Sequence, residues 1–178
     1  MPWYPFFQKM NQSDIFVVLT HCQYEKNGFQ NRFNVDNVWK TMSVYRGLQP
    51  IKEKKYVNAE RDWNKIKMSL PHYSSQLKIF DDCISNDLTE TNIAIIRKIA
   101  HYLNIDTKIV VDHETNTLGT QRLVDLCTNY SADKYIAGTS GKKYLEEKLF
   151  VEQNIKLTYQ KESDMIKKNI LEVLKDVC

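Results

Sequence analysis

The chain has 178 residues, of which 42% are hydrophobic and 26% are charged, and its formal net charge is +3. This composition is typical of a soluble globular protein and predicts a single domain over residues 1–178, with a real hydrophobic core. The mild charge permits an anionic ligand but does not indicate a nucleic-acid surface. No apolar run approaches the roughly 20 residues that cross a bilayer, and the N-terminus lacks a signal-peptide pattern, so we expect a cytoplasmic protein without a membrane partner.

The four cysteines, Cys22, Cys83, Cys127 and Cys178, lie far apart and form no Cys-x-x-Cys motif. In a chain of this size, that spacing favours free thiols in a reducing compartment over a disulfide framework or a zinc site. We expect Cys127 to be buried in an apolar helix stripe and Cys178, the last residue, to be accessible.

The N-terminal segment is aromatic, and it predicts a short helix over residues 6–11 that packs against the body. The next apolar run, Ile15–Leu19, is rich in β-branched residues and predicts a buried, central strand. Polar residues follow it, and ligands bind at such carboxyl ends in open α/β sheets. His21 is therefore a candidate base, although a histidine in this position is more often a hydrogen-bonded structural residue. Gln23 is a candidate for substrate binding.

The stretch Tyr24–Arg32 places polar side chains beside aromatic ones, and a second strand-like segment, Trp39–Val44, comes after it. Loops between strands commonly present binding groups, so Lys26, Asn31 and Arg32 are candidate ligand-binding residues. The alternative is a solvated hairpin whose charges only keep the protein soluble.

The basic cluster at Lys52, Lys54 and Lys55 predicts a solvated loop or edge strand, with phosphate binding as the alternative.

Apolar stripes predict three helices, over residues 59–70, residues 73–84 and a segment that runs from a capping box at Asp87 to a stop at Asn104. A buried strand follows over residues 107–112. It ends on three consecutive polar residues, Asp112, His113 and Glu114. Their side chains alternate between the two sides of an extended segment, so we expect no metal site there.

The last part of the chain alternates strands and helices. A strand over residues 134–138 leads through Thr139, Ser140 and Gly141 into an expected helix, and this arrangement can present backbone N–H groups and a helix dipole to an anion. The alternative is that Ser140 only caps the helix. A strand over residues 155–159 and a terminal helix capped by Ser163 complete the chain. The pattern predicts an α/β fold: a single domain with a mixed sheet, helices on its faces and a Rossmann-like second half.

Two blocks of the sequence resemble the WbqC-like protein family. The first block contains Pro2-Trp3, Phe6-Phe7, Ser13 to Val17, Gln23-Tyr24 and Asn31-Arg32, and the second contains Tyr135 to Gly141, Tyr144-Leu145 and Ile155 to Gln160. The resemblance covers about Pro2 to Gln160. The chain departs from the family's pattern in two places: it lacks the usual His-Gln-Pro-type segment before Pro2, and it has Thr20-His21 where the family tends to have aspartates.

The resemblance implies a role in bacterial surface-polysaccharide, O-antigen type, biosynthesis. The implied activity is that of a transferase that attaches an amino-acid or acyl group to a nucleotide-linked amino sugar. In that interpretation His21 and Asn31 are the catalytic candidates, and the substrate-binding candidates are Gln23, Lys26, Arg32, Gly138, Ser140, Gly141 and Tyr144. No cofactor is identified, and no oligomeric state is implied.

The competing hypothesis is a non-enzymatic module that binds a nucleotide or a nucleic-acid strand. It rests on lysines interleaved with aromatic residues, as base stacking requires. The low net charge and the number of aromatic residues in core stripes argue against a nucleic-acid strand and favour a small anionic ligand.

Overall fold

The computed structural model describes residues 1–177, and Cys178 lies outside the described residues. The chain divides into two compact units. Unit 1 contains residues 1–111 and the C-terminal segment from Lys167, and unit 2 contains Asp112–Ile166. The expectation of one domain over residues 1–178 stays a prediction.

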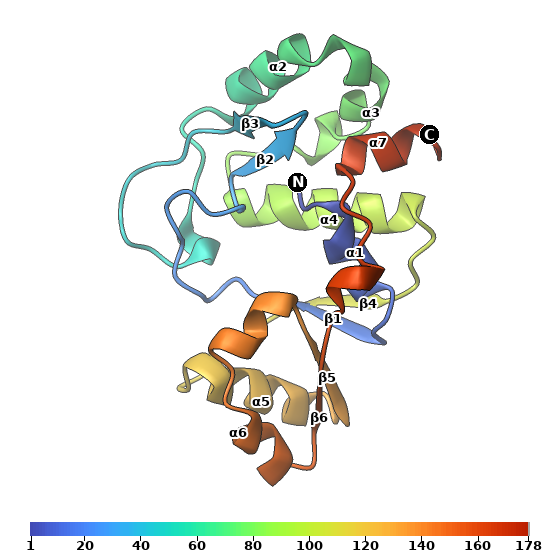
Figure 1. The fold of residues 1–178 in the computed structure, drawn as a ribbon. Coiled ribbons are helices and arrows are strands. Elements are labelled where there is room, and N and C mark those ends of the chain that lie inside the picture. The colour runs from blue at the N-terminus through green and yellow to red at the C-terminus, as the bar shows by residue number, and fades with distance from the viewer. Residues whose placement is uncertain (178) are drawn as a thin grey trace. The chain divides into compact units, whose positions relative to one another are not determined.

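Unit 1 is built of helices, short strands and 3-10 turns (Figure 1). Its elements are α1 (Tyr4–Met10), β1 (Ile15–Val18), β2 (Arg32–Val35), β3 (Val38–Thr41), η1 (Ile51–Glu53), α2 (Ala59–Ser69), η2 (Pro71–Tyr73), α3 (Ser74–Lys78), η3 (Asp81–Cys83), α4 (Leu88–Tyr102), β4 (Lys108–Val111) and α7 (Ile170–Lys175). Unit 2 contains α5 (Gly119–Asn129), β5 (Lys134–Ala137), η4 (Thr139–Lys143), α6 (Glu147–Glu152), β6 (Lys156–Tyr159) and η5 (Glu162–Asp164).

The protein is mixed α/β, as the sequence predicts, but its described strands form three separate two-stranded sheets in place of one mixed sheet. Strand β1 pairs in parallel with β4, and β5 pairs in parallel with β6. Strand β1 is half-buried with one partner, so the expectation of a buried central strand is wrong. The Rossmann-like second half stays a prediction.

The third sheet, β2–β3, is an antiparallel hairpin. Its two-residue turn, Asp36-Asn37, has φ values of +52° and +62°. Positive φ at both turn positions matches the twist of the strands, and Asp and Asn tolerate it better than most residues. Phe33 and Val35 point into the core from β2, because alternate side chains face opposite sides of a strand.

Helices enclose the core of unit 1. Its fully buried side chains include Phe7, Met10, Leu77, Phe80, Leu88, Ile99, Leu171 and Leu174. Asp87 caps α4 by accepting from the Thr89 and Glu90 amides, at 2.8 and 3.0 Å, and this confirms the predicted N-terminus of α4. Asn104 has the left-handed conformation that the predicted stop requires.

Two predicted helices differ in the structure. The apolar stripe over residues 73–84 is broken, because α3 has five residues and is flanked by the 3-10 turns η2 and η3. The terminal helix begins at Ile170 and is capped by Asn169, whose side chain accepts from the Leu171 amide, so the predicted cap at Ser163 is wrong.

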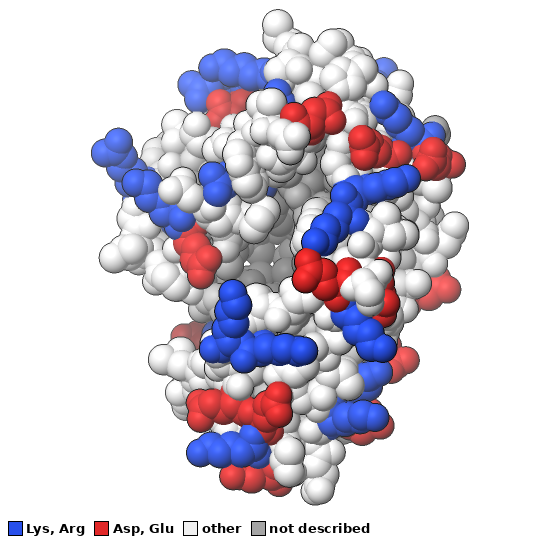
Figure 2. Space-filling view, viewed as in Figure 1, with Lys and Arg blue, Asp and Glu red and all other residues white. Residues whose placement is uncertain are grey.

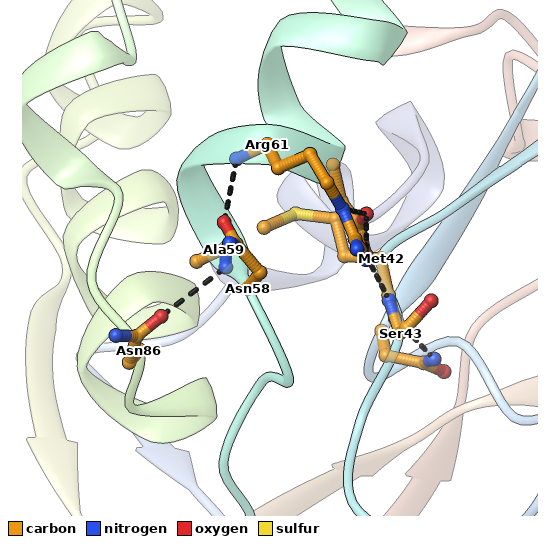
Figure 3. Close-up of polar contacts among 8 residues, drawn as sticks. Met42, Ser43, Asn58, Ala59, Arg61 and Asn86 are labelled. Carbon is orange, nitrogen blue, oxygen red and sulfur yellow. Dashed lines mark hydrogen bonds and ion pairs between the residues drawn. The ribbon is translucent and has the colours of Figure 1, made fainter.

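A polar network joins the end of β3 to the start of α2 (Figure 3). Asn58 caps α2 by accepting from the Arg61 amide at 2.9 Å, and Asn86 accepts from the Ala59 amide at 3.2 Å. The buried Asp62 carboxylate accepts from the Ser43 amide at 2.7 Å. Burial raises the pKa of Asp62, but the hydrogen bonds from Ser43 and Arg61 outweigh burial and lower that pKa overall. The network therefore holds the chain that leaves the hairpin.

Unit 2 has a small core of its own. Val124, Cys127, Phe150 and Ile155 are buried there, and Tyr135 stacks on Phe150 with ring centroids 5.3 Å apart. Cys127 lies in the apolar stripe of α5, as the sequence predicts, and burial raises the pKa of its thiol to about 11. Cys83 and Cys127 are free thiols. No helix within residues 1–177 combines the length and apolar character that a bilayer span needs.

Candidate functional site

The loop between β1 and β2 is folded back on itself by Arg32. Asn27 takes a left-handed conformation, and the Gly28 amide donates to the Glu25 carbonyl at 3.0 Å, which forms the turn. The Arg32 side chain closes it, because Nε donates to the Gly28 carbonyl at 3.2 Å and Nη2 donates to the Asn27 carbonyl. The guanidinium is thus held in place by the backbone of its own loop.

The same guanidinium lies over an exposed tryptophan. Its central carbon is 4.1 Å from the Trp39 ring centroid, and the Phe29 ring is 5.5 Å from that of Trp39. The hairpin register explains the contact: Arg32 pairs with Thr41 and Asn34 with Trp39, so Arg32 and Trp39 are diagonal neighbours on one face. We call Phe29, Arg32 and Trp39 the Arg32–Trp39 ledge.

The ledge exposes groups that a ligand can use. Phe29 is 67% exposed and Trp39 is 43% exposed. Within residues 1–177, no carboxylate pairs with Arg32 and no group engages its Nη1 atom. The Nη1 group of the guanidinium can donate hydrogen bonds to a phosphate, and a flat ring can stack on the neighbouring aromatic faces. The ledge can therefore bind a small ligand that combines a ring with an anionic group.

Asn31, a predicted catalytic residue, uses its amide within the fold. Its Oδ1 accepts from the Tyr24 hydroxyl at 2.9 Å, and its Nδ2 donates to the Met42 carbonyl at 2.8 Å. Burial raises the pKa of Tyr24, although Arg32 opposes that effect, so the hydroxyl keeps its proton at neutral pH. Asn31 therefore ties the loop to the end of β3, and its part in catalysis stays a prediction.

Three other predicted residues lie near this loop in the chain. His21 is half-buried, and its Nδ1 is 3.4 Å from the Thr20 hydroxyl. Gln23 pairs with Pro50 in an isolated antiparallel bridge, and its side chain donates to the Gln49 carbonyl at 3.2 Å. Lys26 is exposed at the turn. Lys26 is thus accessible to a ligand, while Gln23 has a role in joining two loops and His21 already contacts Thr20.

The remaining predicted residues belong to unit 2, where the local structure differs from the expectation. Residues Thr139–Lys143 form a 3-10 helix with no side-chain cap, and the next α-helix, α6, begins only at Glu147. Ser140 is therefore not the cap of an α-helix, and the α-helix that follows the Gly138–Gly141 loop in the chain does not begin at that loop. Ser140 and Tyr144 are exposed, whereas Gly141 is buried. Anion binding by these residues stays a prediction. The helix dipole that motivated it is not supplied by the 3-10 helix that starts at this loop.

The sequence pattern does not indicate the positions that two residues of this region take in the structure. Trp39 was expected only as a strand residue, and its position over Arg32 depends on the hairpin register, which the hydrophobic pattern does not specify. Lys54 was expected in a solvated basic cluster, but its side chain is only 1% exposed. That expectation is wrong for Lys54, because the sequence pattern cannot show that Lys54 has backbone acceptors in the core.

The comparisons with known proteins agree with the sequence resemblance. The model of the WbqC-like protein family matches residues 1–167. The chain belongs to the WbqC-like protein family. A relative of this WbqC-like protein, "Uncharacterized protein Rv1507c" of Mycobacterium tuberculosis, is 26% identical over 89% of this chain and 77% of that protein. No solved structure matches the chain.

Proposed function

We propose that this WbqC-like protein acts in bacterial surface-polysaccharide biosynthesis as a transferase that attaches an amino-acid or acyl group to a nucleotide-linked amino sugar. The observation that carries the proposal is the Arg32–Trp39 ledge, which offers a cation and exposed aromatic faces side by side. A nucleotide-linked sugar has both matching features, a diphosphate and flat or ring-shaped groups. In Figure 2, basic side chains have acidic ones close by within each unit, a pattern that suits a small anionic ligand better than a long nucleic-acid strand.

The proposed reaction forms an amide. The amino group of the sugar attacks the acyl carbon of an activated donor, a C–N bond forms, and the bond to the donor's leaving group breaks with its electron pair. His21 takes the proton that the amine loses, which is a task suited to an imidazole near neutral pH. Arg32 holds the phosphate and Trp39 orients the ring, so that the amine reaches the donor in one geometry.

The second candidate function is nucleotide binding without transfer. It is favoured by the structural use of the Asn31 amide, which leaves His21 as the remaining predicted catalytic side chain. An assay with a nucleotide-linked amino sugar and activated acyl donors distinguishes the two, because only a transferase converts the sugar to its amide.

Replacing Arg32 with lysine tests the proposed binding site. Lysine keeps the charge but loses the planar fork and its stacking on Trp39, so we expect the affinity for UDP-glucosamine to fall about tenfold, the equivalent of one or two hydrogen bonds. Arg97→Lys, a matched exchange at an exposed position of α4, should leave the affinity unchanged. Calorimetric titration measures both affinities. If Arg32→Lys lowers only the melting temperature and binds as the unchanged protein does, Arg32 is a structural clamp and not a phosphate ligand.

A further inference from the structure

Lys54 places a positive charge inside unit 1 without a carboxylate partner. Its side chain is 1% exposed, and Nζ donates to the carbonyls of Tyr45 and Gly47, both at 2.8 Å. Among residues 1–177, no acidic side chain pairs with it. Burying an ammonium group is costly unless its surroundings compensate, and a methionine of similar length would fill the same space without that cost. The buried charge therefore indicates that Lys54 has a function other than filling space in the core.

The third contact of this ammonium group leads toward the ledge. Nζ lies 4.9 Å from the ring centroid of Tyr24, an attractive cation–π distance. The Tyr24 hydroxyl donates to Asn31, and Asn31 donates in turn to the Met42 carbonyl. Asn31 directly precedes Arg32 in the chain, so a continuous series of contacts runs from Lys54 to the backbone neighbour of Arg32.

Lys54 also joins two loops at once. Its carbonyl partners belong to the segment that leaves the hairpin, and its ring partner belongs to the loop that enters it. Backbone contacts reinforce the link, because the Tyr24 amide donates to the Gln49 carbonyl at 3.1 Å. Loss of the charge would remove one of the contacts that orient the Tyr24 ring, whose hydroxyl in turn donates to Asn31.

We infer that Lys54 is a positioning residue for the Arg32–Trp39 ledge: its ammonium group fixes Tyr24, Tyr24 fixes Asn31, and Asn31 sets the backbone from which Arg32 reaches a ligand. The inference rests on the proposed function for the identity of that ligand. Lys54 does not touch the ligand itself, since it is buried and its contacts lie within the fold. Its effect passes through Tyr24.

The test uses Lys54→Met, which keeps the length of the side chain and removes the charge, and Tyr24→Phe, which keeps the ring and removes the bond to Asn31. We expect each to weaken the binding of UDP-glucosamine about tenfold or somewhat less, as the loss of one or two polar contacts would. Lys98→Met is the control, because Lys98 is a partly buried lysine that contacts Ile79 and Asp82 and has no contact with the ledge. Its affinity should be unchanged.

A double variant that also carries Arg32→Lys distinguishes a positioning effect on Arg32 from a general loss of structure. If Lys54 acts through Arg32, the variant with both Lys54→Met and Arg32→Lys should bind about as weakly as Arg32→Lys alone, because coupled residues are not additive. If the double variant loses affinity by the product of the two single losses, the inference is overturned. Unchanged affinity in a folded Lys54→Met variant would also overturn it. Should Lys54→Met fail to fold, Tyr24→Phe decides in its place, and normal affinity in that variant overturns the inference.

A readout without ligand keeps this inference distinct from the proposed function. The indole N–H resonance of Trp39 should shift in Lys54→Met and Tyr24→Phe, and it should stay in place in Lys98→Met. If the unchanged protein does not bind UDP-glucosamine but that resonance shifts, the positioning role stands and the proposed function fails. If the protein binds normally and the resonance does not shift, the positioning role fails alone.

Discussion

Replacing Asp112 with alanine should destabilise unit 2 by about 3–5 kcal/mol, which is typical of removing one partner from a buried ion pair. The Asp112 carboxylate pairs with the Arg122 guanidinium, and the two side chains are 0% and 7% exposed. The Nε atom of Arg122 has no hydrogen-bond partner among residues 1–177, so the guanidinium is already incompletely satisfied. Without Asp112 its charge would stay buried with no carboxylate beside it, and that cost falls on the folded state.

Urea denaturation followed by circular dichroism measures this loss. Asp82→Ala is the matched control, because Asp82 also pairs with a basic residue, Lys98, but is 71% exposed. Surface pairs contribute about 0–1 kcal/mol, so Asp82→Ala should unfold at nearly the original urea concentration. Equal, small losses in the two variants would contradict the account of Asp112 and Arg122 as a buried pair that stabilises unit 2.

Replacing Gly141 with alanine adds a methyl group and should lower the free energy of unfolding by about 1–3 kcal/mol, the usual cost of overpacking. A Cβ atom there would lie 2.9 Å from Leu145 Cδ1 and 3.1 Å from Ala137 Cβ. Leu145 can move its side chain, but the Cβ of Ala137 is fixed to the backbone of β5. Gly141 therefore has a packing role, whether or not the loop binds an anion.

Gly138→Ala is the control for that variant, and it also tests the predicted anion site. Apart from Gly138 itself and its two chain neighbours, residues 1–177 place no heavy atom within 4 Å of a Cβ built at Gly138, and its φ of −69° suits alanine. The exchange should stabilise the protein slightly, by about 0.4–1 kcal/mol, because it restricts the unfolded chain. Thermal melts give both stabilities. If Gly141→Ala melts no lower than Gly138→Ala, Gly141 is not closely packed. If Gly138→Ala melts normally but loses affinity for UDP-glucosamine, the ligand approaches the loop.

Periodicity predicted the helices that pack on the core by one face. The stripe and caps of α4 follow from Asp87, Glu90 and Asn104, because capping depends on neighbours within one turn. The stripe from Tyr73 to Ile84 predicted buried residues but not the backbone, which breaks into 3-10 turns around α3. A stripe reports which face is buried, and it does not require that one helix carry the whole stripe.

The candidate site was harder to predict, because its residues meet through contacts across the fold. Arg32 was found from its chemistry, but its contact with Trp39 depends on the register of the hairpin. Lys54 is buried because carbonyls from a loop seven to nine residues away surround it, and the charge of the residue argued for the surface instead. Local patterns do not contain that information.

Titration of UDP-glucosamine into isotope-labelled protein, followed at the three tryptophan indole N–H resonances, tests whether the Arg32–Trp39 ledge binds a nucleotide-linked sugar. The chain provides its own controls: Trp3 is 48% exposed and lies outside the ledge, and Trp63 is 3% exposed with its indole bound to Asp81 at 2.7 Å. A Trp39→Phe variant assigns the third resonance. We expect the Trp39 resonance to shift and saturate while those of Trp3 and Trp63 stay in place. Saturation of the protein with no shift at Trp39, or no binding at all, would show that the ledge does not bind this ligand.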